Sequence, residues 1–482
     1  MSAPSSSSTQ PSRALTTTTP TSNSTYTVQA TALEDGTVRE VLTLADSHAP
    51  DEVPEDGTHS TATGSSTSSA AFFRNDGSIT RDKRPAEADA EPDLPIQRPR
   101  LGPLHRRTAD DGHFKVTIGD TLADPHSDTR YTLEAVLGAG TWANFVRATE
   151  SPSGRVVALK VSRALERYRE GCSHEVEIVR YLEQYEQQQH LDAISRIHSA
   201  FEVEGHPVHV VPLLTTSLYK YLKGNSYQPF PLLHVQLLMS QTLHIIHTCH
   251  RAGITHTDLR PENLLLTSAS SDEITRSNGN KYKMLRDPQI HILDFSGATR
   301  DDEYHASLIS TRHYRAPEVI LSMGWSHSAD MWSLGCIFAE LVLGKDVFPI
   351  HDDFEHLVLA QRLVGHMSLD FARRAKGSVL PECTWFERST APEHAALRRP
   401  PWVLRAPAAH PPLLDVPDFD RLASLEVNLR RALGDEPLAS LVVELITSLL
   451  RWEPTQRLTA SQALAHPFFS ASIPLAPPPF CR

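Results

Sequence analysis

The sequence predicts an α+β protein with two lobes, a β-rich first lobe and a helical second lobe, preceded by a disordered tail. Three observations support this prediction. After Tyr131, apolar residues alternate in short runs, which is typical of strands. After Pro231 they recur at helical spacing instead. Before both regions, residues 1–107 contain too few apolar side chains to form a core.

The tail is polar and locally basic. Fifteen of the first 26 residues are Ser or Thr, and Tyr26 is the only aromatic residue before Phe72. Such a segment cannot bury enough apolar surface to offset its ordering entropy, so we predict that residues 1–107 are disordered. Between Arg81 and Arg107 the basic residues form short clusters, which suit a nuclear-import address. The alternative is a charged linker that keeps the tail soluble.

The remainder, residues 108–472, begins with the predicted β-rich lobe at about 131–214. Gly-bearing turns separate its strand-like runs, which predicts an antiparallel meander. A helix follows, because apolar residues return at helical spacing. These elements are expected at residues 131–137, 145–149 and 155–161 for the strands and 173–183 for the helix.

The second lobe is expected at about 215–470. Thr459 is a suitable N-cap for its last helix. Prolines crowd residues 376–420, which predicts an irregular insertion, and residues 473–482 form a short C-terminal tail. The helices are expected at residues 232–251, 329–343, 355–364, 438–450 and 459–466.

Composition excludes several classes of protein. Lys and Arg number 46 against 58 Asp and Glu, and the net charge of -12 disfavours direct binding to nucleic acid. There is no stretch of 18 apolar residues and no signal pattern, so we expect no membrane segment and a soluble, intracellular protein. Five distant cysteines without a CxxC pair disfavour disulfides and zinc. Cys249 and Cys336 fall in expected helices, so we expect both to be core residues and not reactive thiols.

A glycine-rich turn lies between the first two expected strands. Gly138 and Gly140 would let backbone amides approach a phosphate, because neither residue has a Cβ. This signal alone is weak, since most Gly-x-Gly turns are ordinary hairpins. It becomes stronger because an apolar strand ends at Lys160, and Glu175 lies 15 residues further on in a helical pattern. Glu175 would hold the lysine within reach of a phosphate.

The strongest chemical signal is the run His-Thr-Asp-Leu-Arg-Pro-Glu-Asn at residues 256–263. Asp258 and Asn263 have the spacing of a loop that supplies a base and a metal ligand together. Asp294, at the end of a buried strand, would supply the main carboxylate for Mg²⁺. Phosphoryl transfer needs a carboxylate that orients the hydroxyl, cations on the phosphates and hard oxygen ligands for magnesium. Two further blocks follow at residues 310–318 and 330–335.

These blocks, in this order, resemble the protein-kinase signature set, which implies the bilobal eukaryotic protein-kinase fold. His-Thr-Asp at residues 256–258, the run 310–321, Gly-Trp-Ser at 324–326 and Asp-Asp-Gly-His at 110–113 resemble the LAMMER (Clk-type) dual-specificity kinases of the CMGC group. The helix that names this family is eroded at residues 355–365. The resemblance covers residues 110–470 or so. A neighbouring kinase branch that also carries Arg315 is the alternative, against which residues 256–258 and 324–326 argue.

The resemblance implies catalytic and metal-binding roles. Asp258 accepts or orients the proton of the substrate hydroxyl. Arg260 stands where the family has lysine, and keeps a cation near the transferring phosphoryl group. Asn263 and Asp294 bind Mg²⁺. Asp330 bonds the backbone of this loop.

The resemblance also implies an ATP site. Lys160, paired with Glu175, holds the inner phosphates. Val211 is the gatekeeper, Pro212 offers only its carbonyl to adenine, and Leu214 donates its amide. The other residues expected to contact ATP are Leu137, Gly138, Ala139, Gly140, Thr141, Phe145, Ala158, Leu265 and Asp294.

Three positions depart from the family pattern. Ala143 replaces the third glycine of the phosphate loop, and Ser296 replaces the glycine of Asp-Phe-Gly, so both segments should be stiffer. Thr257 replaces the arginine that receives an activation-segment phosphate in many kinases, which predicts activity without an upstream activator. Glu318 and Arg457 are expected to form a buried ion pair.

The sequence therefore predicts an ATP- and Mg²⁺-dependent protein serine/threonine kinase, with tyrosine as a further acceptor. The resemblance implies substrates rich in arginine and serine, such as splicing factors, which an acidic surface would attract. We expect a monomer in the nucleus, with the cytoplasm as a second location. The alternative, motivated by Ala143 and Ser296, is a catalytically weak or inactive pseudokinase scaffold that binds nucleotide and partners.

Overall fold

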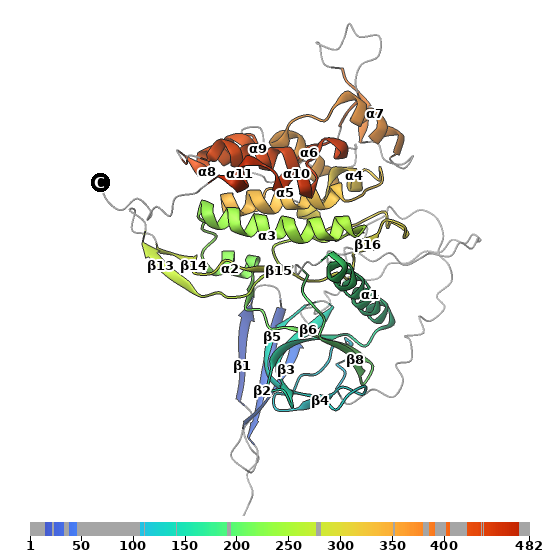
Figure 1. Ribbon diagram of the computed structural model, residues 1–482, viewed down its shortest axis with the longest axis vertical. Coiled ribbons are helices and arrows are strands. Elements are labelled where there is room, and N and C mark those ends of the chain that lie inside the picture. The colour runs from blue at the N-terminus through green and yellow to red at the C-terminus, as the bar shows by residue number, and fades with distance from the viewer. Residues whose placement is uncertain are drawn as a thin grey trace, which may run out of the picture. The chain divides into compact units, whose positions relative to one another are not determined.

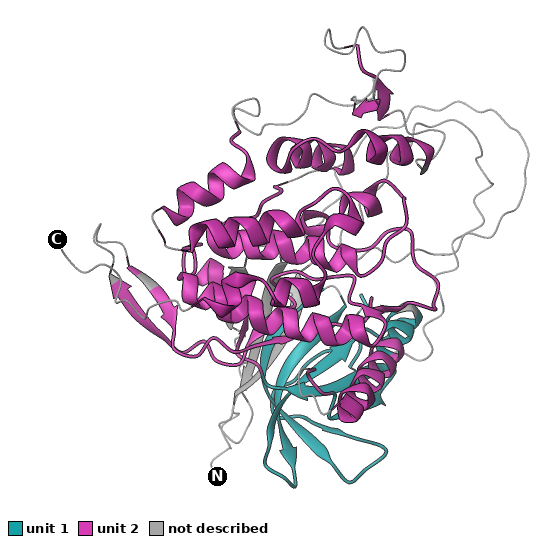
Figure 2. Cartoon of the chain, turned by 45° about the horizontal axis from the view of Figure 1, so that its top comes forward, with its two compact units in different colours: residues 1–70, 80–172, 197–213 teal, residues 71–79, 173–196, 214–482 magenta. Residues whose placement is uncertain are grey.

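The computed structural model divides the chain into two compact units (Figure 2). Unit 1 comprises residues 1–70, 80–172 and 197–213, and unit 2 comprises residues 71–79, 173–196 and 214–482. The structure describes residues 15–21, 24–32, 38–45, 107–109, 111–140, 142–189, 194–275, 281–349, 352–378, 385–390, 402–404, 422–434, 436 and 438–471.

Unit 1 contains a six-stranded antiparallel sheet (Figure 1). The predicted meander is confirmed, because the three predicted strands are consecutive neighbours in this sheet. The first two are a few residues longer than expected, and the third is shifted by one residue. In spatial order the strands are β4 (Thr121–Ala123), β5 (Arg130–Ala139), β6 (Ala143–Ser151), β7 (Val156–Ser162), β9 (His206–Pro212) and β8 (Ser199–Val203).

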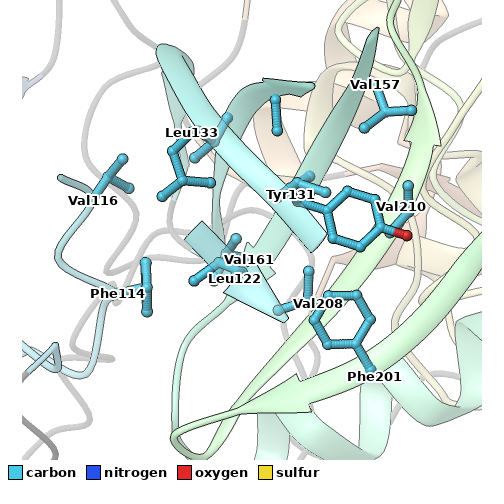
Figure 3. Close-up of a cluster of buried hydrophobic side chains, with 13 residues drawn as sticks. Phe114, Val116, Leu122, Tyr131, Leu133, Val157, Val161, Phe201, Val208 and Val210 are labelled. Atoms are coloured by element: carbon cyan, nitrogen blue, oxygen red, sulfur yellow. The ribbon is translucent and has the colours of Figure 1, made fainter. Parts of the chain in front are cut away.

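One face of this sheet forms the core of unit 1 (Figure 3). In β7, Val157, Leu159 and Val161 all belong to the buried cluster and are almost fully inaccessible. Because side chains alternate along a strand, Ala158 and Lys160 lie on the opposite face. The hydrophobic pattern of β7 thus decides which face is left for chemistry.

The tail holds three strands that the composition did not predict: β1 (Leu15–Thr21), β2 (Ser24–Ala32) and β3 (Val38–Ala45). They form an antiparallel sheet in the order β1-β2-β3. Their sequences are rich in Thr and Val, whose branched side chains favour extended backbone. The prediction considered apolar burial and overlooked this propensity. The rest of residues 1–106, with most of the basic clusters, lies outside the described residues.

Unit 2 is mostly helical, and the five helices predicted for the second lobe are confirmed within a few residues. The Thr459 cap is also confirmed, because its hydroxyl accepts a hydrogen bond from the Gln462 amide at 3.2 Å. The helices are α1 (Glu166–Gln189), which begins in unit 1, then α2 (Leu218–Gly224), α3 (Leu232–Arg251), α4 (Pro317–Ile320), α5 (Ser328–Leu343), α6 (Asp353–Val364), α7 (Leu369–Ser378), α8 (Leu425–Leu433), α9 (Ala439–Leu449), α10 (Ala460–Leu464) and α11 (Pro467–Ser470).

Helix α5 is the central helix of unit 2, buried from Ala329 to Val342 and in contact with α3, α8 and α9. Gly335 permits the close approach, since a Cβ there would lie 2.8 Å from Leu450 Cγ. Cys249 in α3 and Cys336 in α5 are 0 and 1% exposed, which confirms them as core residues. Burial raises the pKa of both thiols.

Short strands lie at the ends of the loops of unit 2 that carry the sequence blocks singled out above. Among the described helices none is long and apolar enough to cross a membrane. The insertion predicted as irregular contains two paired strands, β17 and β18, among its described residues. The strands of unit 2 are β10 (Thr216–Ser217), β11 (Ile254–Thr255), β12 (Leu264–Leu266), β13 (Ser271–Thr275), β14 (Lys281–Leu285), β15 (Ile290–Ile292), β16 (Thr299–Arg300), β17 (Phe386–Arg388) and β18 (Trp402–Leu404).

Candidate active site

The glycine-rich turn of unit 1 joins β5 to β6. Gly138 pairs with Phe145 in the sheet register, and Ala139 pairs with the next residue back along β6. The Gly140 amide donates to the Ala143 carbonyl at 2.9 Å, which closes the turn. Thr141, a predicted phosphate contact, lies outside the described residues.

Lys160 lies in a row of residues on the face of the unit 1 sheet opposite the buried cluster. It pairs with Phe145 on β6 and His209 on β9, and it is 9% exposed. Ala158, two residues earlier on the same face, pairs with Val211. The structure therefore groups Phe145, Ala158, Lys160 and Val211 on one face, as an adenine and phosphate site requires. Leu137, at the end of this sheet, is 38% exposed.

The catalytic loop of unit 2, residues 256–263, is anchored by Asp330 of α5, as predicted. The Asp330 carboxylate accepts the His256 amide at 2.8 Å and the Thr257 amide at 3.0 Å. It also accepts His250 Nε2 at 2.9 Å. Burial acts to raise the pKa of Asp330, but the hydrogen bonds and charge of His250 hold it below its usual value.

Thr257 adopts a φ of 71°, which a β-branched residue rarely does. Its hydroxyl donates to the Gly297 carbonyl at 2.7 Å. Its own carbonyl accepts the Ser310 hydroxyl at 2.7 Å. The residue that replaces arginine is thus bonded to both ends of the segment between Asp294 and Glu318.

Asp258 is held by Thr311, which belongs to the block 310–318. Its Oδ1 accepts the amide of Thr311 at 3.0 Å and the hydroxyl of Thr311 at 2.8 Å. Arg260 Nη1 donates to that same hydroxyl at 2.9 Å. Burial raises the pKa of the Asp258 carboxyl, while the Arg260 charge acts in the opposite direction. The arrangement places a carboxylate, a hydroxyl and a cation together, as proton orientation at a substrate hydroxyl requires.

Asn263 and Asp294 are adjacent in unit 2, because the Leu293 amide donates to the Asn263 carbonyl at 3.0 Å. Asn263 Nδ2 donates to the Asp258 carbonyl at 2.8 Å, so the amide oxygen is the atom of this side chain that could bind a metal. A carboxylate and an amide oxygen fit Mg²⁺, which takes few protein ligands and completes its shell with phosphates and water. Among the described residues, no group of three or more His, Cys, Asp or Glu offers an alternative metal centre.

Ser296 bonds to the predicted metal ligand. Its hydroxyl donates to Asp294 Oδ1 at 2.8 Å. The sequence showed that glycine was missing here, but it did not show this bond. Thr311 is a second residue that sequence reasoning missed as a site residue, although it lies within the recognised block 310–318.

Helix α1 contacts the segment that follows Asp294. The Phe295 amide donates to Glu175 Oε1 at 3.3 Å, and His174 Nε2 contacts the Ala298 carbonyl at 2.6 Å. Glu175 is 5% exposed. The predicted pairing of Glu175 with Lys160 joins residues of different units and stays a prediction.

The predicted structural pair is confirmed. Arg457 donates two hydrogen bonds to Glu318, at 2.5 and 2.7 Å, and both side chains are almost fully buried.

The residues expected around adenine lie in both units. Leu265 lies in β12 of unit 2, and the stretch of unit 2 that follows β9 begins at Leu214. Pro212 ends β9 opposite Val157. The hinge roles of these residues stay predictions.

Comparison with known proteins identifies the class. Residues 131–469 match the family model described as protein kinase domain. A solved crystal structure of a kinase domain aligns with a TM-score of 0.56 and 24% identity, covering 74% of this chain and 99% of that one, which shows the fold. The chain therefore belongs to the protein kinase family.

Its relatives identify the branch. The chain is 34% identical to dual specificity protein kinase lkh1 of Schizosaccharomyces pombe over 76% of this chain and 49% of that protein, so it spans about half of that relative. It is 33% identical to serine/threonine-protein kinase AFC1 of Arabidopsis thaliana, over 79% of each chain. It is 33% identical to human dual specificity protein kinase CLK1, over 75% of this chain and 69% of the relative. These are LAMMER (Clk-type) kinases of the CMGC group.

Proposed function

We propose that this chain transfers the γ-phosphate of ATP to serine and threonine hydroxyls, and to tyrosine, in proteins rich in arginine and serine. The observation that carries the proposal is the contact of Asp258 with Thr311 and Arg260, because it places a base beside a cation in the loop that the family uses for catalysis. The intact set of Asp258, Asn263 and Asp294 disfavours a pseudokinase scaffold.

The chain's own residues would divide the work. Asp258 orients the substrate hydroxyl and accepts its proton, while Arg260 keeps positive charge beside the transferred phosphoryl group. Asn263 and Asp294 would hold Mg²⁺, which when bound neutralises charge on the phosphates. Lys160 would contact the inner phosphates from unit 1.

We also propose that the enzyme is active without phosphorylation of its activation segment. The contacts of Thr257 with Gly297 and Ser310 support this, because they fix the segment through neutral hydrogen bonds instead of an arginine and a phosphate. Treatment with a phosphatase should therefore leave the rate of transfer unchanged. The basic clusters between Arg81 and Arg107 support a nuclear location, which imaging of a fluorescent fusion would test.

The test is phosphate transfer from ATP and Mg²⁺ by the full chain to an Arg-Ser repeat peptide, with a Gly-Ser peptide of equal length as comparison. Lys160→Met and Asp258→Ala should each reduce kcat by about 10²–10⁴-fold. Asp370→Ala is the matched control, because Asp370 is exposed and pairs only with Arg373 among the contacts seen. No transfer by the wild type, with ATP still bound, would support the scaffold instead. Equal rates on both peptides would exclude the Arg-Ser preference.

A further inference from the structure

The segment Asp111-Gly112-His113 lies beside the glycine-rich turn of unit 1 and is not explained by the proposed chemistry. His113 Nε2 is 3.0 Å from the Gly140 carbonyl oxygen. His113 Nδ1 is 2.7 Å from Asp111 Oδ2, and the His113 amide donates to Asp111 Oδ1 at 3.0 Å. The ring is nearly covered, with 12% of the side chain exposed.

Both partners of the ring can only accept hydrogen bonds. A carboxylate and a backbone carbonyl carry no proton, so each nitrogen of His113 must carry one for both bonds to form. The imidazolium satisfies both at once, whereas either neutral tautomer loses one. Burial acts to raise the pKa of Asp111, but the hydrogen bonds from His113 lower it, which keeps the carboxylate charged beside the ring.

The other two residues of the segment hold it in place. Gly112 has a φ of 89°, and a Cβ there would lie 3.3 Å from Leu165 Cγ, so glycine is required. The Gly112 carbonyl accepts the Ala164 amide at 2.9 Å, and the Asp111 carbonyl accepts Arg163 Nη2. Each residue of the segment thus contributes to placing the His113 ring against Gly140.

The turn is tied to Arg163, which also holds the segment, and to Tyr168. The Arg163 amide donates to the Trp142 carbonyl at 3.0 Å, and the Trp142 ring lies edge-on to Tyr168 at 4.9 Å. Arg163 is also within 5.1 Å of the Tyr168 ring. The charged and titratable groups seen around the His113 contact are therefore Asp111 on its own segment, Arg163 after β7 and Tyr168 on α1.

We propose that His113 is a positioning residue for ATP: held by Asp111, it fixes Gly140 and thereby sets the glycine-rich turn over the nucleotide phosphates. This inference rests on the proposed function, since it assigns the turn to ATP. A glycine-rich turn is otherwise free to sample many backbone states, and fixing one carbonyl reduces that freedom before the ligand arrives.

The test compares the full chain with His113→Phe, which keeps a ring but removes both donors, and with His113→Gln, whose amide can still donate to Gly140. His126→Phe is the matched control, because His126 is an exposed histidine of the same unit. Two quantities are measured: KM for ATP against kcat, and amide hydrogen exchange of residues 137–145 without nucleotide.

His113→Phe should raise KM for ATP about tenfold, which corresponds to about 1.4 kcal/mol, with kcat within about twofold of wild type. His113→Gln should recover part of the affinity. Exchange in residues 137–145 should be faster in His113→Phe than in the control.

Unchanged KM and unchanged exchange in His113→Phe would overturn the proposal, and so would equal changes in His126→Phe. If His113→Phe does not fold, His113→Gln decides, through KM for ATP and hydrogen exchange in residues 137–145. If the wild type transfers no phosphate, the proposed function fails, but hydrogen exchange still reports whether His113 fixes the turn. Faster exchange with unchanged KM would show a structural contact only and would also overturn the positioning role.

Discussion

The catalytic loop of unit 2 and the glycine-rich turn of unit 1 are held by contacts of opposite kinds. At the catalytic loop, Asp330 receives three hydrogen bonds from donors that are buried with it. At the turn, the contact is an ionisable histidine between two acceptors near the surface, together with backbone bonds. Buried charge-assisted bonds are costly to break, whereas exposed ones exchange with water.

This difference matches the two tasks. Groups that orient a reacting hydroxyl must stay within a few tenths of an ångström of their position. A loop over a nucleotide must also let the product leave, and such loops come from the less stable parts of a fold. The four predictions below test the contrast, and they run from the largest expected effect to the smallest.

Asp330→Asn should disrupt the catalytic loop, the region held by buried hydrogen bonds. The amide cannot accept from His256, Thr257 and His250 together, so buried donors lose their partner. We expect the free energy of unfolding to fall by about 3 kcal/mol or more, with kcat reduced at least about tenfold. Urea unfolding and phosphate transfer measure the two effects. Asp301→Asn, at an exposed carboxylate, is the control, and an equal effect there would contradict the prediction.

Glu340, also on α5, should make the stability of unit 2 depend on pH. The direction is opposite to that of Asp330, because the pKa of Glu340 is raised and that of Asp330 is lowered. Burial raises its pKa to about 7 from an ordinary 4.5, against the hydrogen bond from Tyr314 at 2.7 Å. A raised pKa gives stability that is complete below pH 4.5 and is lost as pH rises through 7, by about 3 kcal/mol in all.

Glu340→Gln should remove that loss. Chemical unfolding at pH 5 and pH 8 would show the wild type weakening more than the variant across this interval. Parallel curves for the two proteins would mean that Glu340 is already ionised at pH 5.

Thr257→Val tests the neutral hydrogen bond that stands where many kinases have arginine. Valine keeps the shape but leaves the Gly297 carbonyl without this donor, which should cost about 1 kcal/mol of stability. Thr215→Val is the matched control, because its hydroxyl donates to the Thr267 carbonyl at an exposed position. Thermal unfolding measures both, and a larger loss in the control would refute the assignment.

Gly140→Ala sharpens the flexible side of the comparison. A Cβ at Gly140 would meet only the Ala143 carbonyl oxygen, at an ordinary 3.8 Å. Stability should therefore change by less than about 0.5 kcal/mol, while KM for ATP rises because the methyl group stands where phosphate approaches. A large drop in melting temperature would show that the fold, and not the ligand, needs this glycine.

Sequence reasoning proposed the residues whose chemistry the reaction demands, and their roles stay predictions. Asp258, Asn263 and Asp294 could be predicted because phosphoryl transfer restricts their type and spacing. The partners of these residues could not, since Thr311 and Ser296 are common hydroxyls whose bonds depend on how loops distant in sequence meet. At position 257 the sequence shows only that threonine stands where many kinases have arginine. That the threonine hydroxyl reaches Gly297 required the backbone.

The same limit applies to the fold. The five helices of the second lobe followed from apolar spacing, which reports burial directly. Strands β1 to β3 did not, because their pairing depends on backbone propensity in a segment poor in apolar residues.

The left-handed backbone of Thr257 has a consequence for how the protein matures. A threonine cannot hold a φ of 71° by itself, since that conformation costs about 1–2 kcal/mol, and its own amide and that of His256 are held by Asp330. The catalytic loop can therefore take its working shape only after α5 has docked. A nascent chain that ends at Asp294 contains Asp258, Asn263 and Asp294, but it still lacks the carboxylate of α5 that holds the catalytic loop.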